Sequence, residues 1–164
     1  MVATVVSAMH IAPVVSFWLL KKSAKSVVVM SKQGRLNLLG MLLLPVAVVV
    51  AAAIATANGV WNAYSETYIF LFALNSVVTV PAAIFSGLFL RRSVGDTARW
   101  VAILPTIIPS VYGAVWYLWR GVFPAKIAPG AEYIGAVQYL LIGMILITFL
   151  VLVARITGLA PRNS

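Results

Sequence analysis

The histidine at position 10 is the residue in this sequence best suited to hold a cofactor, and it is the single histidine of the chain. It lies within an apolar run, and an ionisable residue inside a membrane span is by default a functional hypothesis. A haem b at His10 would need its second axial ligand from another chain or from a methionine such as Met41 or Met144. The alternative is a neutral histidine that donates to a carbonyl of a neighbouring helix.

A second group of polar residues surrounds two prolines. Each proline removes one backbone donor and frees the carbonyl four residues earlier, and broken helices of this kind line substrate sites in transporters. The alternative is that the prolines bend helices, while the hydroxyls and amides hold helices together at about 0.6 kcal/mol per bond. The candidate ligand-binding or pore-lining residues are Asn75, Thr79, Pro105, Thr106, Pro109, Ser110 and Tyr112.

The acid and cysteine content argues against catalysis by this chain alone. Cysteine is absent, so thiolate nucleophiles and thiolate metal ligands are excluded. The three acids, Glu66, Asp96 and Glu132, fall in loops or at helix ends, where they form no cluster for metal-dependent or general acid–base chemistry. No metal site is predicted, and enzymatic activity is not expected.

Five apolar runs must position these residues. Hydrophobic residues make up 63% of the 164-residue chain and charged residues 9%, and its mean hydropathy is +1.05. Each run is about 20 residues, the length that a helix needs to cross the bilayer. We therefore predict an all-α integral membrane protein, one domain over 1–164 with a bundle of five transmembrane helices at 2–20, 36–57, 68–90, 100–119 and 133–154.

The net charge of +9 is distributed as a topology signal. If the loops alternate between sides, ten of the twelve basic residues share one side. The positive-inside rule then places the N-terminus outside and the C-terminus in the cytoplasm of a multi-pass cell-membrane protein. This arrangement favours anionic lipid headgroups over nucleic acid as the partner. The expected headgroup-binding residues are Lys21, Lys22, Lys25, Lys32, Arg35, Arg91 and Arg92.

Small residues at four-residue spacing, as in Ala47, Ala51 and Ala55, predict close helix packing within the chain or against other membrane subunits. Together with the short loops, they favour a non-catalytic integral subunit or scaffold of a larger membrane complex, with a respiratory or redox host suggested by His10. A small transporter or channel for a neutral or anionic solute is the alternative, using the proline-broken helix at 100–119. A haem- or quinone-binding membrane protein is the third hypothesis.

Overall fold

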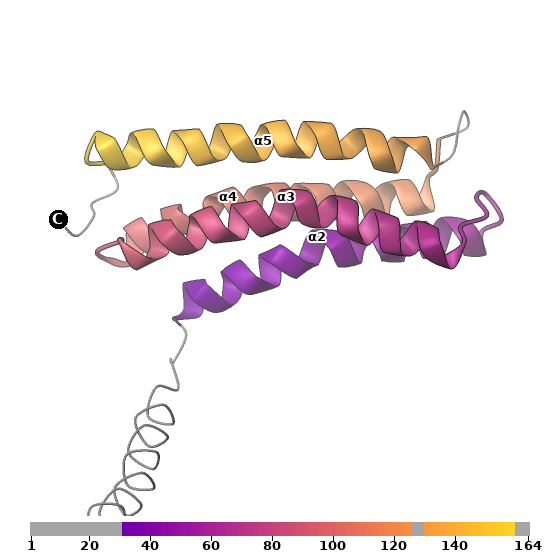
Figure 1. Ribbon diagram of the computed structural model, residues 1–164, viewed down its shortest axis with the longest axis horizontal. Coiled ribbons are helices and arrows are strands. Elements are labelled where there is room, and N and C mark those ends of the chain that lie inside the picture. Colours follow the sequence, from indigo (N-terminus) through magenta and orange to yellow (C-terminus); the bar gives the residue numbers. More distant parts are fainter. Residues whose placement is uncertain (1–30, 126–129, 160–164) are drawn as a thin grey trace, which may run out of the picture. The chain divides into compact units, whose positions relative to one another are not determined.

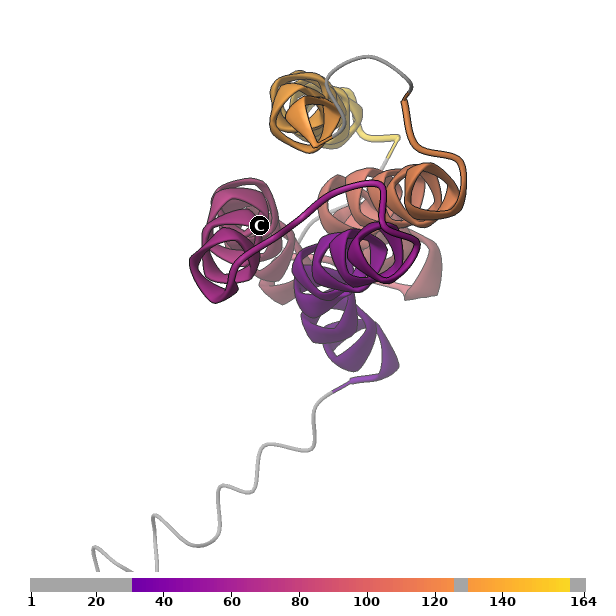
Figure 2. The same cartoon turned by 90° about the vertical axis from the view of Figure 1, so that its right-hand side faces the viewer.

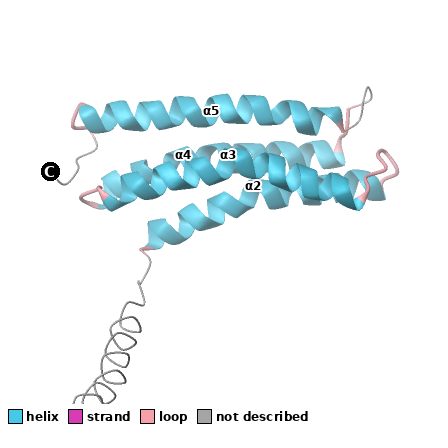
Figure 3. Cartoon of the chain, viewed as in Figure 1, coloured by secondary structure: helices cyan, strands magenta, loops and turns pink. Residues whose placement is uncertain are grey.

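A computed structural model describes residues 31–125 and 130–159, which form four α-helices and no strand (Figures 1 and 3). Their bounds are α2 Lys32–Ala57, α3 Ser65–Arg91, α4 Asp96–Val122 and α5 Ala131–Ile156. All four are long and apolar enough to cross a membrane. The prediction of an all-helical protein compatible with multiple membrane crossings is confirmed for this part of the chain.

The predicted first helix at 2–20 lies outside the described residues, and so do His10, Lys21, Lys22 and Lys25. The helix count of five and the orientation of the two termini therefore stay predictions.

The helices begin two to four residues before the predicted apolar runs, because a polar first turn precedes each run. Glu66, Asp96 and Glu132 all lie in such first turns. Arginines occupy the last turns of the same three helices, at Arg91, Arg120 and Arg155. Acids near the N-terminus and bases near the C-terminus oppose the partial charges of the helix dipole, so these charges stabilise the helix ends.

The expectation of a broken fourth helix is wrong in one respect, because α4 is continuous through both Pro105 and Pro109. Pro45 and Pro81 likewise lie inside α2 and α3. Inside a helix each proline removes one backbone hydrogen bond, and its ring crowds the carbonyl four residues earlier, which weakens that turn. Neighbouring helices can then support the weakened turn in a membrane protein.

The helices run alternately in opposite directions, with α2 and α5 on opposite sides of the α3–α4 pair (Figures 1 and 2). One end of the described bundle gathers the start of α2, the end of α3, the start of α4 and the end of α5. Six of the seven described basic residues belong to this end, which we call the basic end. The opposite end carries Trp61, Tyr117 and Tyr133 and is called the aromatic end.

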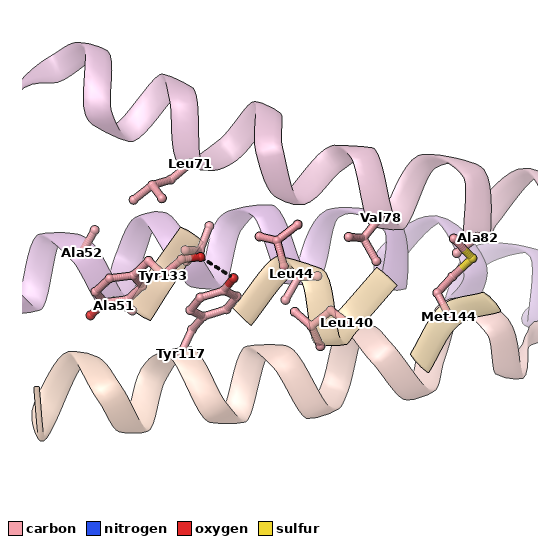
Figure 4. Packing of buried hydrophobic residues seen from close by; sticks show 12 residues of the cluster. Leu44, Ala51, Ala52, Leu71, Val78, Ala82, Tyr117, Tyr133, Leu140 and Met144 are labelled. Atoms are coloured by element: carbon pink, nitrogen blue, oxygen red, sulfur yellow. Dashed lines mark hydrogen bonds between the residues drawn. The ribbon is translucent and has the colours of Figure 1, made fainter. Parts of the chain in front are cut away.

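Small residues allow α2 and α4 to touch. Ala47, Ala51 and Ala55 are all buried. A Cβ atom placed on Gly121 of α4 would lie 2.8 Å from the backbone oxygen of Ala51, so the two backbones are in direct contact there. Larger side chains fill the remaining interior, among them Leu44, Val78 and Met144 (Figure 4).

Candidate functional site

Four of the sequence-predicted site residues lie in the interior of the bundle. Asn75 and Thr79 of α3, and Thr106 and Ser110 of α4, all have 0% of their surface exposed. Because none of them touches a space large enough for water, they line no water-filled path in this conformation. Pro105 is fully buried beside them.

The hydrogen bonds of these polar residues join neighbouring helices or link two turns of one helix. The Thr106 hydroxyl donates to Ser86 Oγ at 2.9 Å and so joins α4 to α3. The Asn75 amide donates to the Leu71 carbonyl at 3.0 Å within α3 and also interacts with the Tyr117 hydroxyl of α4. Asn37 of α2, which the sequence analysis did not single out, donates to the Ala83 carbonyl of α3 at 2.9 Å.

Among the four predicted residues of this interior, two polar atoms have no hydrogen-bond partner in the described part of the chain, namely Asn75 Oδ1 and Ser110 Oγ, and Asn37 Oδ1 of α2 is in the same state. A buried polar group without a partner is unfavourable by about 1–3 kcal/mol. Amide and hydroxyl groups can bind a polar ligand through hydrogen bonds, but they offer no general acid or base near neutral pH. These groups could therefore hold a polar ligand through hydrogen bonds.

Tyr112 belongs to a different surface from the other candidates. It is 67% exposed and, together with Pro109, lines a groove between α4 and α5. The groove has a volume of about 460 Å³, within the range of ligand-binding pockets. The α5 side of this α4/α5 groove includes Glu132, Gly135, Tyr139 and Gly143. The groove could not be predicted from the sequence, because two glycines and an acid in α5 form a groove only once α5 is packed against α4.

One end of the α4/α5 groove is polar. Glu132, in the first turn of α5, forms an ion pair with Arg120 in the last turn of α4. The second carboxylate oxygen of Glu132 accepts a hydrogen bond from the backbone N–H of Ala125 at 3.2 Å. This acid thereby connects both helices to the chain that follows α4.

Stacked aromatic rings close the same end of the bundle. Trp61 stacks on Tyr133 with 5.5 Å between ring centroids, and Tyr133 stacks on Tyr117 at 5.7 Å. The Tyr117 hydroxyl donates to the Tyr133 carbonyl at 3.0 Å (Figure 4). Gly130, with a φ of 94°, permits the approach, since a Cβ there would lie 2.7 Å from the Trp61 ring. The stack attaches the α2–α3 loop to the start of α5.

The basic end presents its charges outward. Lys32, Arg35, Arg91 and Arg92 are exposed, as the headgroup prediction requires of them. Gln33 of α2 donates to the Asp96 carboxylate of α4 at 2.7 Å. Arg155, by contrast, is buried and donates to the Phe89 carbonyl of α3 at 2.8 Å.

Comparison with known proteins identified no relative of this chain. No family model matches the chain, and neither a curated protein nor a solved structure matches it.

Proposed function

We propose that this chain is a non-catalytic integral subunit or scaffold of a larger membrane complex in the cell membrane. The observation that carries the proposal is that interior polar side chains hydrogen-bond to neighbouring helices. Asn37 joins α2 to α3, and Thr106 joins α4 to α3, each through a buried hydrogen bond. A helical bundle whose polar groups join its own helices is suited to holding a fixed shape against a partner.

The surface supports the same proposal. Large apolar side chains are exposed along α5, including Ile142, Leu146, Phe149 and Leu150. Lipid or a neighbouring helix can cover such a face, and the partners proposed here are other membrane subunits or a second copy of the chain. Because bases gather at one end of the described bundle, we place that end in the cytoplasm, with a fifth helix at 2–20 and the N-terminus outside.

Gentle purification tests this proposal. The chain, carrying an affinity tag, is extracted in a mild detergent, and the bound chains are identified and counted by native mass spectrometry. We expect a constant stoichiometry with at least one other membrane chain or with a second copy. A monomer carrying only lipid would refute the proposal. A Soret absorption band that is lost in His10→Ala would instead favour the haem-binding hypothesis.

A transporter or channel is the second candidate, and one observation favours it. Asn75 Oδ1 and Ser110 Oγ are buried without a hydrogen-bond partner in the described part of the chain. A second conformation that opens the interior next to Pro109 would let a neutral or anionic solute reach both atoms.

Cysteine labelling separates the two candidates, because the natural chain contains no cysteine. Ser110→Cys is treated in native membranes with a water-soluble maleimide, and Thr97→Cys, at an exposed position of the first turn of α4, serves as the control. The scaffold predicts labelling of position 97 alone. Labelling at position 110 would favour a solute path.

A further inference from the structure

The α4/α5 groove is long enough to hold one lipid acyl chain. It extends along α5 from Glu132 to Ile147, a separation of roughly 22 Å at 1.5 Å per residue. If α5 spans the bilayer, as proposed above, the groove begins in the first helical turn and ends just past the middle of the helix. Half of the hydrocarbon core is about 15 Å thick, so the groove crosses one leaflet.

Side chains of the described residues leave the α4/α5 groove open. A Cβ atom on Gly135 or Gly143 would meet no other atom within 4 Å. Gly113, on the α4 side, is different, because Leu44 and Leu140 already fill the space beside it. The two α5 glycines therefore provide room that no described side chain occupies.

Among the described residues, the polar end of the groove has one acid in its lining, Glu132, and one base beside that acid, Arg120. Glu132 lines the groove, and its carboxylate accepts from two nitrogens of Arg120 and from the Ala125 N–H. A carboxylate has about four acceptor positions, so one stays available for another donor. The side chain of Arg120 beside it is 21% exposed. This pair complements a zwitterionic headgroup, whose ammonium meets the acid and whose phosphate meets the base.

We propose that the α4/α5 groove binds one acyl chain of an amine-bearing phospholipid such as phosphatidylethanolamine. Glu132 accepts a hydrogen bond from the primary ammonium of the headgroup, and Arg120 faces its phosphate. The lipid belongs to the leaflet at the aromatic end. This proposal rests on the membrane crossing of α4 and α5 and is independent of which chains the protein assembles with.

Native mass spectrometry with defined lipids tests the headgroup. The delipidated protein is titrated with phosphatidylethanolamine, phosphatidylcholine and phosphatidylglycerol of identical acyl chains. Phosphatidylcholine is the matched probe, because its methylated nitrogen has the same charge and no N–H. We expect phosphatidylethanolamine to bind about tenfold more tightly than phosphatidylcholine, as one charge-assisted hydrogen bond predicts. Equal affinity for these two lipids would refute the assigned headgroup contact.

Paired variants test the two parts of the site. Glu132→Gln should reduce the preference for phosphatidylethanolamine, whereas Arg120→Gln breaks the same ion pair, leaves the acid in place and should retain the preference. The double variant Gly135→Leu/Gly143→Leu should lose the bound lipid, because the two leucine side chains fill the α4/α5 groove. Gly87→Leu on α3 is its control, since a Cβ there also meets nothing within 4 Å.

Three outcomes would overturn the proposal. The first is retention of the lipid by the double glycine variant, and the second is equal loss in Gly87→Leu. The third is that the double variant loses a bound second copy of the chain and not a bound lipid. That result would make the groove a protein interface. Recovery of partner chains with every variant would leave the proposed subunit role standing, so the two proposals fail separately.

Discussion

The contact between Gly121 and Ala51 makes a quantitative prediction about the α2–α4 interface. In Gly121→Ala the new methyl group would lie 2.8 Å from the Ala51 oxygen and 2.9 Å from its Cα. These are backbone atoms, so the two helices must separate to relieve the overlap. Overpacking of this kind destabilises proteins by about 1–3 kcal/mol.

A matched variant isolates this effect from helix propensity. Alanine is favoured over glycine inside a helix by about 0.8–1.0 kcal/mol, and this gain applies to any interior glycine. Gly143→Ala in α5 receives the gain without an overlap, because nothing lies within 4 Å of its Cβ. We therefore expect Gly143→Ala to be about 1 kcal/mol more stable than the natural chain, and Gly121→Ala to be about 1–3 kcal/mol less stable than Gly143→Ala.

Equilibrium unfolding in mixed micelles measures this difference. Helical content and tryptophan fluorescence are followed as sodium dodecyl sulfate is added to the protein in a mild detergent. Ala51→Gly combined with Gly121→Ala should not restore stability, because the overlap involves the backbone of residue 51. Equal unfolding free energies for Gly121→Ala and Gly143→Ala would refute the close approach of α2 and α4.

Two further predictions use the same unfolding measurement, and a third uses limited proteolysis. Asn37→Leu removes the hydrogen bond to the Ala83 carbonyl and should destabilise the bundle by about 0.6 kcal/mol, and at most by about 1.7 kcal/mol. Gln138→Leu, at an exposed position of α5, should change the unfolding free energy little. Equal effects of the two variants would contradict the buried role of Asn37. Tyr117→Phe keeps the stacked ring and loses the hydrogen bond to the Tyr133 carbonyl and the interaction with the Asn75 amide, so it should destabilise less than Tyr117→Leu, which also loses the ring. The reverse order would show that stacking contributes little. Arg155→Met removes the donor to the Phe89 carbonyl and the cation above the Phe89 ring, so it should make the C-terminal end of α5 more sensitive to proteolysis. Arg155→Lys should show intermediate sensitivity. If Arg155→Met resists proteolysis as well as the natural chain does, Arg155 does not hold this end of α5 against α3.

Local properties explain why much of the fold could be predicted. The need for about 20 apolar residues per crossing located all four described helices, and the turns added at their ends were polar or charged. Basic residues cluster in alternate loops, and this pattern anticipated the basic end of the described bundle. The relative depth of the interior polar residues could not be predicted, because Thr106 of α4 bonds to Ser86 of α3, which lies roughly 16 Å along α3 from Asn75 at 1.5 Å per residue.

The sequence by itself determined which segments are helical, where along each helix a residue lies and where the charges gather. Only the tertiary structure decided the rotation of each helix about its own axis. That rotation placed Thr106 and Ser110 in the interior and Tyr112 on the α4/α5 groove, although all three residues were grouped together in the sequence. The physical reason is that a membrane helix is apolar on both its lipid-facing and its protein-facing sides, so hydrophobicity does not mark the buried face. Packing against neighbouring helices, through contacts such as Gly121 against Ala51, selects that face.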